Sequence, residues 1–348
     1  MSAPRPVGIA ALAEADAVID ARSPAEHALD HIPGAHNAPA LYDGERERVG
    51  TLYKQVGAFE ARRVGGALMA ANLARHAERR WADKPANWRP LVYCWRGGMR
   101  SGAMVTWMRL VGWQALQLEG GYKTWRRHVM ERIETLSPQL DLRVIAGPTG
   151  SGKTRLLHAL VAAGAQVLDL EGLARHKGSV LGGVPGAPQP AQTAFETQLA
   201  QVLMRHPPGA PLWVEAESRR IGRITLPTPF WERLRASPGI ALDVPRVARI
   251  GFLREDYAHF GQDPAPLLAA LESLHRVQSR ENLSRWRGWA MAGELDWLVE
   301  ELLALHYDPL YARSQATAPR MSVALPDLSA HTLAATAQAL TDAGASGS

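Results

Sequence analysis

Short apolar runs alternate with segments of helical periodicity along most of the chain. Three runs predict buried strands because their apolar residues are nearly unbroken: Ala17–Asp20, Pro90–Tyr93 and Leu142–Ala146. A helix is predicted from about Ser101, where Met104 and later apolar residues recur on one face. Because strands that alternate with helices form parallel sheets, the pattern predicts an α/β fold.

The alternation of strands and helices restarts after Ser137–Pro138, and farther along the chain it gives way to helices alone. Strands are predicted at Gln166–Leu170 and Leu212–Val214. Farther along the chain the periodicity becomes helical, most clearly at Leu267–Leu274 and Leu295–Leu305. The second half therefore combines a further α/β pattern with a helical extension.

The chain length and the Ser-Pro break predict the domain organisation. The 348 residues fit about two domains, at ~100–200 residues each. We expect an N-terminal domain at residues 1–137 and a second domain with its helical extension at 138–312. Residues 313–348 are rich in Ala and Thr and are predicted to form a tail with one helix near Thr332–Leu340.

Composition excludes several classes of protein. Apolar residues make up 46% and charged residues 21% of the chain, which is typical of a folded soluble protein. No run approaches the ~20 apolar residues of a membrane span and no secretory signal is present, so we expect a cytoplasmic protein without a membrane partner. The formal charge of +5, from 39 basic and 34 acidic residues, permits a polyanionic partner such as RNA but does not require one.

The chain has one cysteine, Cys94, which excludes an intramolecular disulfide and a multi-cysteine zinc site. It begins the segment Cys94-Trp95-Arg96-Gly97-Gly98-Met99-Arg100-Ser101, between a predicted strand and a predicted helix. Such a junction directs backbone N–H groups and the positive end of a helix dipole at an anion, so it stabilises a thiolate. We expect a reactive cysteine rather than an inert buried thiol. The predicted anion cradle consists of Arg96, Gly97, Gly98 and Arg100.

Two chemistries fit this cysteine loop. One is chalcogen transfer, in which the sulfur carries the transferred atom. The other is phosphate-ester hydrolysis, because phosphatases also place five residues between Cys and Arg. A phosphatase usually has His before the cysteine, whereas Tyr93 precedes Cys94.

The second half contains a complete match to the phosphate-binding pattern G-x-x-x-x-G-K-[ST], in Gly147-Pro148-Thr149-Gly150-Ser151-Gly152-Lys153-Thr154. The match follows a predicted strand and begins a predicted helix, which is the context that the pattern requires. Glycines let backbone N–H groups face phosphates, Lys153 reaches the terminal phosphate, and Thr154 can ligate Mg²⁺. The predicted phosphate contacts are Gly147, Thr149, Gly150, Ser151, Gly152, Lys153 and Thr154.

Four carboxylates follow the next predicted strands: Asp169, Glu171, Glu215 and Glu217. They either support Mg²⁺ beside the phosphate loop or are ordinary surface carboxylates. None ends an apolar run as the acidic residue of a nucleotide hydrolase does, so a diphosphate other than ATP is also a candidate ligand. Whether ATP is used stays open at this point.

Two basic segments are candidates for binding RNA. The first mixes cations with an aromatic ring, which suits phosphate contacts and stacking on unpaired bases. Its pattern also describes an amphipathic helix with core tryptophans and a solvated basic face. The first segment is Arg285, Trp286 and Arg287, and the second is Arg219, Arg220 and Arg223.

The N-terminal domain resembles the rhodanese family. The resemblance is carried by the cysteine loop with Asp20-Ala21-Arg22-Ser23, His31-Ile32-Pro33-Gly34-Ala35 and Gly120-Gly121-Tyr122. It favours chalcogen transfer over ester hydrolysis. The cysteine loop has one residue more before its Arg-Ser than simple rhodaneses have, which implies a wider cradle.

Further segments resemble one family across nearly the whole chain, up to Tyr311. Asp169–Ser179, Phe195-Glu196, Val214–Gly222 and Tyr307–Tyr311 are similar to the tRNA 2-selenouridine synthase family. The resemblance implies an N-terminal rhodanese-like domain and a C-terminal P-loop domain with a parallel sheet and a helical extension. It also implies an enzyme that replaces the sulfur of wobble-position 2-thiouridine in tRNA with selenium from selenophosphate, and that transfers a geranyl group from geranyl diphosphate to that sulfur.

This resemblance gives the two motifs expected roles. The P-loop is expected to hold the diphosphate of geranyl diphosphate with Mg²⁺ at Thr154, and Cys94 to carry selenium as an S-selanyl intermediate. The expected macromolecular partner is the anticodon loop of tRNA. Two alternatives stay open: a P-loop kinase or ATPase with a regulatory rhodanese-like domain, and a chalcogen-relay or RNA-binding adaptor whose P-loop is only structural.

Overall fold

The computed structural model divides into two compact units. The first comprises Met1–Arg132 together with Thr193–Ala200, and the second comprises Ile133–Gln192 and Gln201–Ser348. The first unit thus includes a short segment from far beyond the predicted domain boundary at residue 137. The residues that the structure describes are 6–179, 182–183, 186–256, 264–314 and 321–345.

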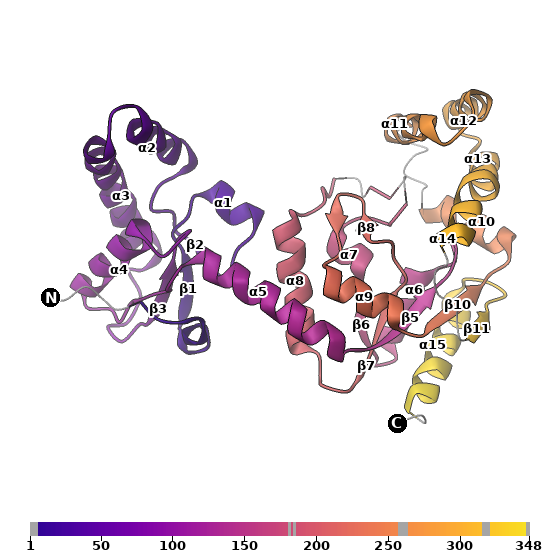
Figure 1. The fold of residues 1–348 in the computed structure, drawn as a ribbon, viewed down its shortest axis with the longest axis horizontal. Coiled ribbons are helices and arrows are strands. Elements are labelled where there is room, and N and C mark those ends of the chain that lie inside the picture. Colours follow the sequence, from indigo (N-terminus) through magenta and orange to yellow (C-terminus); the bar gives the residue numbers. More distant parts are fainter. Residues whose placement is uncertain (1–5, 180–181, 184–185, 257–263, 315–320, 346–348) are drawn as a thin grey trace. The chain divides into compact units, whose positions relative to one another are not determined.

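The first unit is built on a four-stranded sheet (Figure 1). Its strands are β1 (Ala17–Asp20), β2 (His36–Asn37), β3 (Pro90–Tyr93) and β4 (Leu116–Gln117). They pair in parallel in the order β2-β1-β3-β4, and β1 and β3 have the predicted bounds. Register places Asp20 beside Tyr93 at the carboxyl ends of β1 and β3, directly before Cys94.

Helices complete the first unit. They are α1 (Pro24–Leu29), α2 (Asp43–Gln55), α3 (Ala58–Arg80), α4 (Met99–Val111) and α5 (Tyr122–Leu136). Helix α4 begins two residues before the predicted start at Ser101. The sequence pattern did not predict α2 and α3, because α2 has no buried residue and α3 has only four. The core between helices and sheet contains Trp81, Trp88 and Trp113, with ring centroids 5.2 to 6.3 Å apart.

The second unit contains a five-stranded parallel sheet. Its strands are β5 (Asp141–Ala146), β6 (Gln166–Leu168), β7 (Pro211–Glu215), β10 (Gly239–Asp243) and β11 (Met321–Ala324). The order is β11-β10-β5-β7-β6, so β5 lies at the centre. The strand predicted at 166–170 ends at Leu168, because Asp169 begins a short helix, α7 (Leu170–Ala174), as its cap.

The remaining helices include the predicted helical extension. Figure 1 shows α11, α12 and α13 as a cluster, and their buried leucines surround Trp286. A π-helical turn, Leu303–Tyr307, joins α13 to α14, and a short antiparallel hairpin pairs β8 (Arg220–Ile221) with β9 (Ile224–Thr225). These elements and the two parallel sheets confirm the predicted α/β class. The helices are α6 (Lys153–Ala162), α8 (Gln192–Arg205), α9 (Thr228–Ala236), α10 (Arg246–Asp256), α11 (Ala265–Ser273), α12 (Arg280–Ala292), α13 (Leu295–Leu302), α14 (Asp308–Ser314) and α15 (Ala330–Ala345).

The C-terminal segment is part of the second unit's fold, which corrects its description as a tail. Strand β11 pairs with β10 along its whole length, and α15 packs against α6. Leu333, Ala337 and Leu340 of α15 are buried in the same core as Leu160 of α6. The sequence pattern understated this role because β11 has no fully buried residue and the buried face of α15 is partly alanine.

We predict that Leu333→Ala destabilises the second unit. Leu333 is 4% exposed, and deleting a buried leucine side chain costs about 2–5 kcal/mol through lost transfer energy and the cavity left behind. Urea unfolding measures the change. The exposed residue Gln338 on the same helix gives the control, because Gln338→Ala changes stability by no more than about 0.5 kcal/mol. Equal stability of the two variants would contradict a packed role for α15.

Candidate functional site

Cys94 directly follows β3, as predicted, and begins the loop that leads into α4. Its side chain is 3% exposed, and Sγ accepts a hydrogen bond from Ser101 Oγ at 3.1 Å. Gly98 precedes α4 and provides no side-chain cap, so the N–H groups of the first turn lack that partner. These N–H groups and the helix dipole favour an anion at this end of α4.

Residues around β4 and α5 fix the position of the loop. Tyr122 N donates to Cys94 O at 2.8 Å, and Gln117 Nε2 donates to Gly97 O at 2.7 Å. Gly121 has a φ of +58°, and a Cβ at this position would lie 2.2 Å from Cys94 O. Only glycine permits so close a backbone approach, so the Gly-Gly-Tyr motif determines where the cysteine lies.

The two arginines of the predicted cradle have different surroundings. Arg96 is exposed, whereas Arg100 NH1 lies 2.7 Å from Glu26 Oε2. Arg46 Nε lies 3.3 Å from the same carboxylate. Burial alone would raise the pKa of Glu26, but the hydrogen bond from Arg100 lowers it overall. One carboxylate thus meets two guanidinium groups, which leaves positive charge beside the loop.

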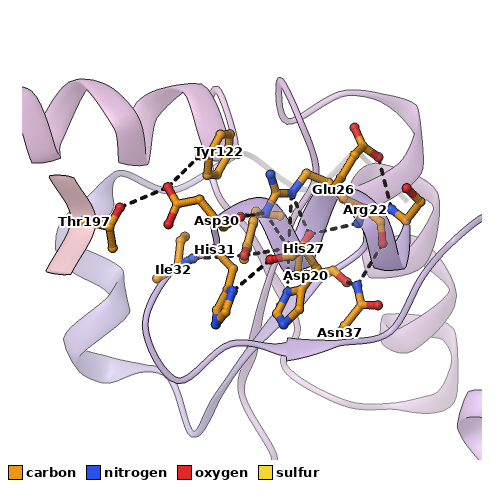
Figure 2. Close-up of polar contacts among 12 residues, drawn as sticks. Asp20, Arg22, Glu26, His27, Asp30, His31, Ile32, Asn37, Tyr122 and Thr197 are labelled. Carbon is orange, nitrogen blue, oxygen red and sulfur yellow. Dashed lines mark hydrogen bonds and ion pairs between the residues drawn. The ribbon is translucent and has the colours of Figure 1, made fainter. Parts of the chain in front are cut away.

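A buried ion pair supports the strand end that carries the cysteine (Figure 2). Arg22 is 1% exposed and pairs with Asp20 at 2.7 Å. Asp20 also accepts a hydrogen bond from Tyr93 Oη at 2.9 Å and lies 3.0 Å from His27 Nδ1. Burial alone would raise the pKa of Asp20, but the contacts with His27 and Arg22 lower it overall, so the carboxylate stays ionised. Because Tyr93 immediately precedes Cys94, this network holds the base of the loop.

A second buried carboxylate explains why Thr193–Ala200 belongs to the first unit. Figure 2 shows Asp30 between Tyr122 and Thr197, whose hydroxyl groups donate to Asp30 Oδ2 at 2.7 and 3.0 Å. Arg126 NH1 lies 3.7 Å from the same oxygen. Burial raises the pKa of Asp30 despite these contacts. Thr197 therefore supplies a hydrogen bond to a carboxyl group that is nearly inaccessible to water.

The phosphate loop follows the central strand β5, and Lys153 begins α6 as predicted. Gly150 and Gly152 have φ values of +80° and +75°, which favour glycine. Lys153 Nζ donates to Gly147 O at 3.2 Å, so its ammonium group lies across the loop. This conformation matches the loop that the motif predicts for phosphate binding.

Arg249 of α10 holds the phosphate loop from the side of the helical extension. Its guanidinium group is nearly buried and donates twice to Thr149 O, at 2.7 and 2.9 Å. The same group pairs with Asp308 at 2.6 Å. Asp308 belongs to the Tyr307–Tyr311 motif of the sequence, and this contact gives that motif a structural role.

Three of the four predicted carboxylates gather beside Thr154. Thr154 Oγ1 donates to Glu171 Oε2 at 3.1 Å, and Glu171 N donates to Glu215 Oε1 at 2.8 Å. Glu171 and Glu217 are hydrogen-bonded through their side chains. Burial raises the pKa of both, that of Glu217 to about 8, and Lys153 offsets only part of this effect. The carboxyl pair therefore shares a proton at neutral pH in the absence of a cation.

Glu215 and the fourth carboxylate, Asp169, position Glu171. Glu215 is fully buried, and burial raises its pKa well above the ordinary value. Its contact with the Glu171 N–H places the first turn of α7. Asp169 caps the same helix, with its side chain accepting the Gly172 N–H at 2.6 Å.

The phosphate loop lines a cavity of about 1080 Å³ whose lining mixes polar and apolar side chains. The polar part of the lining includes the loop, Thr154, Glu171, Glu217, Lys177 and Arg219. The rest includes apolar and aromatic side chains, so the cavity suits a ligand with an anionic end and a hydrocarbon end. Its apolar lining includes Trp231, Leu234, Phe252, Leu253, Leu310 and Tyr311.

The first predicted RNA-binding group lies on α12 and is largely engaged within the protein. Arg285 pairs with Glu301 at 2.8 Å, and Arg287 pairs with Glu272 at 3.3 Å. Trp286 has no exposed surface, and its Nε1 donates to Glu301 at 2.8 Å. The expectation that Trp286 stacks on a base is therefore corrected: it is a core residue of an amphipathic helix.

The second group, Arg219, Arg220 and Arg223, lies on and beside the β8–β9 hairpin. All three side chains are exposed. Within the part of the chain that the structure describes, none of them pairs with a carboxylate. Arg219 also lines the cavity, whereas Arg220 and Arg223 are not part of its lining.

Sequence reasoning missed several residues that build these sites. Gln117 and Thr197 have no motif around them, and their roles arise from pairing between distant segments. Arg249 could have been noticed in the sequence, because it is a cation on the same helical face as the apolar residue Leu253 of α10.

Comparison with known proteins gives the same two parts. A family profile described as "Rhodanese-like domain" matches residues 9–128, and one described as "tRNA 2-selenouridine synthase AAA domain" matches residues 140–279. A tRNA 2-selenouridine synthase of Nitrosomonas europaea is 37% identical over 286 residues, covering 78% of this chain and 74% of that protein.

Two further relatives have the same name. The protein of Bdellovibrio bacteriovorus is 34% identical over 338 residues, covering 85% of this chain and 88% of its own. The protein of Marinobacter nauticus is 33% identical over 327 residues, covering 84% of this chain and 87% of its own. The chain belongs to the tRNA 2-selenouridine synthase family. None of the helices among the described residues is long and apolar enough to cross a membrane.

We predict that Gly121→Ala disrupts the cysteine loop of this family member. The new Cβ would collide with Cys94 O, and the positive φ adds backbone strain of about 1–3 kcal/mol. Urea unfolding and the rate of alkylation of the single cysteine by iodoacetamide measure the effect. Gly66→Ala, in α3 of the same unit and outside the cysteine loop, is the control, because no atom lies within 4 Å of its added Cβ. An unchanged alkylation rate and stability for Gly121→Ala would show that the loop does not depend on this approach.

We predict that Glu217→Gln flattens the pH dependence of stability. A carboxyl group whose folded pKa is raised stabilises the fold below its unfolded pKa, here 4.5, and loses that contribution as pH rises to about 8. Glutamine keeps a neutral side chain throughout, so the metal-free variant becomes more stable than the wild type above pH 8. The free energy of unfolding, measured with urea in EDTA at several values between about pH 5 and pH 9, checks this. The exposed Glu232 is the matched control, since Glu232→Gln leaves the profile unchanged.

Proposed function

We propose that this chain replaces sulfur with selenium in 2-thiouridine of tRNA, through an S-geranyl intermediate. The name shared by its relatives, tRNA 2-selenouridine synthase, supports the tRNA-modifying activity. The observation that carries the intermediate is the cavity whose lining combines a phosphate loop with apolar side chains. Geranyl diphosphate has the same two parts, a diphosphate and a hydrocarbon chain.

The first step is transfer of the geranyl group to sulfur. The thiocarbonyl sulfur of the base attacks C1 of geranyl diphosphate, the C1–O bond breaks, and the N3 proton of the base passes to water. Negative charge then collects on the departing pyrophosphate. The N–H groups of the phosphate loop and the ammonium group of Lys153 stabilise that charge. Apolar side chains hold the hydrocarbon chain and keep water from the reacting carbon.

Mg²⁺ fits the residues beside this diphosphate. Thr154, Glu171 and Glu217 offer oxygen atoms, which Mg²⁺ prefers, and the proton that the two carboxyl groups share would leave when the cation binds. In the described residues no cluster of three His, Cys, Asp or Glu forms a complete metal cage, so phosphate oxygens and water would supply the other ligands. Bound there, the ion supplies Lewis-acid stabilisation of the departing pyrophosphate.

The second step is exchange of the alkylated sulfur for selenium. S-alkylation makes the sulfur a good leaving group, and it departs from C2 as geranylthiol with a proton. Selenophosphate supplies selenium at the selenide level: a water oxygen replaces selenium on phosphorus, and phosphate leaves. A small-molecule disulfide accepts the two electrons that are lost when this selenium bonds to Cys94 Sγ, and Cys94 carries it as an S-selanyl group at the anion-binding end of α4. Because the chain has a single cysteine, a small-molecule thiol returns two electrons to open the sulfur–selenium bond, and the released selenide forms the C2–Se bond as geranylthiol departs.

The tRNA is proposed to contact the β8–β9 hairpin. Arg219, Arg220 and Arg223 are exposed there, and Arg219 reaches the lining of the cavity in which the base must react. Unpaired guanidinium groups bind RNA phosphates without first breaking an ion pair. The arginines of α12 already pair with Glu301 and Glu272, so they are the weaker candidates.

We predict that two single variants separate the two steps. Lys153→Ala lowers the rate of geranylation at least about 100-fold, because it removes the main cation facing the diphosphate. Cys94→Ser keeps geranylation and loses selenation. Nucleoside mass spectrometry of 2-thiouridine tRNA, incubated with Mg²⁺, geranyl diphosphate, selenophosphate and a mixture of reduced and oxidised dithiothreitol, measures both products. Full selenation by Cys94→Ser would refute the carrier role, and wild-type geranylation by Lys153→Ala would refute the diphosphate assignment.

The same reactions test the kinase or ATPase alternative. Omitting each donor in turn is expected to give the S-geranyl nucleoside without selenophosphate and an unchanged nucleoside without geranyl diphosphate. Steady ATP hydrolysis without tRNA, together with an unchanged nucleoside, would favour the alternative. Binding of tRNA without any reaction would favour an adaptor.

A further inference from the structure

Trp95 is an exposed aromatic residue that the proposed mechanism has not used. It directly follows Cys94 in the cysteine loop, and its side chain is 40% exposed. An exposed indole ring offers a ligand a large apolar face. The other tryptophans of the first unit are buried or half-buried: Trp81, Trp88, Trp107, Trp113 and Trp125. The ring beside the thiol is therefore the one that a ligand of this unit can reach most readily.

The ring of Trp95 is held by a neighbour that is itself fixed. Its centroid lies 5.2 Å from that of the Tyr122 ring, with 32° between the ring planes. Tyr122 donates its hydroxyl to Asp30 at 2.7 Å (Figure 2), and the buried guanidinium group of Arg22 lies 3.9 Å from the centre of its ring. Because the neighbour is fixed, Trp95 is already oriented before a ligand binds, and binding loses little side-chain entropy.

Three exposed cations accompany Trp95 in the loop and on α5. Arg96 is the next residue of the chain, and Lys123 donates its backbone N–H to Trp95 O at 3.2 Å. Arg127 lies one turn after Lys123, on the same face of α5. Among the residues that the structure describes, no carboxylate pairs with these three cations. Free cations beside an exposed ring are typical of surfaces that bind single-stranded nucleic acid, since the cations meet phosphates and the ring meets a base.

The proposed second step brings the substrate base to this place. C2 of the base has to meet the selenium that Cys94 carries on Sγ. Cys94 is only 3% exposed, so the base approaches over the exposed part of the loop. The Cα atoms of Cys94 and Trp95 are about 3.8 Å apart across their trans peptide bond, which puts a base at the thiol within reach of the indole ring.

We infer that Trp95 stacks on the unpaired uracil base of the tRNA while its C2 receives selenium at Cys94. Arg96, Lys123 and Arg127 contact the phosphates on either side of this base. The inference rests on the proposed function, which brings the base to Cys94. Trp95 forms and breaks no bond: it binds the base and positions C2. Trp95 is not part of the cavity lining at the phosphate loop, so its role is confined to the second step.

Selenation of tRNA that already carries S-geranyl-2-thiouridine, with selenophosphate and the dithiothreitol mixture, tests the inference. Trp95→Ala is expected to raise the KM for this tRNA about 5- to 100-fold, the effect of removing one stacked ring. Trp95→Phe keeps an aromatic ring and is expected to stay within about threefold of the wild type. Geranylation of 2-thiouridine tRNA by both variants is expected to be unchanged.

Trp297→Ala is the matched control. Trp297 is 59% exposed, belongs to the second unit and lies outside the cavity lining, so its variant is expected to have the wild-type KM. A wild-type KM in Trp95→Ala, with normal selenation by the unaltered protein, overturns the role of Trp95 and leaves the proposed function standing. Equal loss of geranylation and selenation in Trp95→Ala shows a general disruption and also overturns it.

Trp95→Leu separates stacking on the base from contact with the geranyl chain. Met99 of the same loop is 69% exposed, so an apolar contact with the hydrocarbon is the competing explanation. Leucine keeps an apolar side chain but has no aromatic face, and Trp95→Leu is therefore expected to behave as Trp95→Ala does. A wild-type KM in Trp95→Leu assigns the residue to the hydrocarbon chain and overturns stacking.

Cross-linking to the unaltered protein covers variants that do not fold and the case in which no product forms. A tRNA with 5-iodouridine at the wobble position forms a covalent bond on irradiation with an aromatic ring that stacks on it. Mass spectrometry of the peptides is expected to find the tRNA on Trp95. Binding of this tRNA without a cross-link at Trp95 overturns the inference. A cross-link at Trp95 without any modified nucleoside supports the stacking role and refutes the proposed function.

Discussion

Parallel strand pairing is the constraint on which both sites depend. A parallel strand must be followed by a crossover, so the residues after several strands converge at one edge of the sheet. In the first unit this brings Asp20 and the residues before Cys94 side by side. In the second unit, the phosphate loop after β5 lies next to the end of β7, where Glu215 receives the N–H of Glu171. Each motif then needs only the correct residue types at the ends of its strands.

Buried carboxyl groups are stabilised in two different ways in this protein. Asp20 keeps its charge because a buried guanidinium group, His27 and Tyr93 surround it, so it serves as a permanent structural anion. Glu171 and Glu217 are hydrogen-bonded to each other instead, and the ammonium group of Lys153 acts on both. Such a pair holds a proton until a stronger cation replaces it. The first arrangement rigidifies a fold, and the second prepares a site for a charged ligand.

The helical extension is part of the phosphate site. Arg249 and Asp308 connect its helices to the carbonyl of Thr149, and some apolar side chains of the cavity lining come from the same helices. An isolated phosphate loop binds phosphate but has no hydrocarbon-binding surface. The extension supplies part of that surface. This combination is the physical reason for proposing an amphiphilic diphosphate rather than a nucleotide as the ligand.

Local patterns in the sequence determined the strands β1, β3 and β5, the phosphate loop and the cysteine loop, because each depends on residue type and spacing within one short segment. Helices α2 and α3 and strand β11 escaped prediction, since few of their residues are buried. Only the tertiary structure decided that Trp286 is core, that Thr197 satisfies Asp30, and that Glu171 and Glu217 share a proton. Those properties arise from contacts between segments far apart in the chain, where burial and a neighbour's charge, rather than residue type, set the outcome.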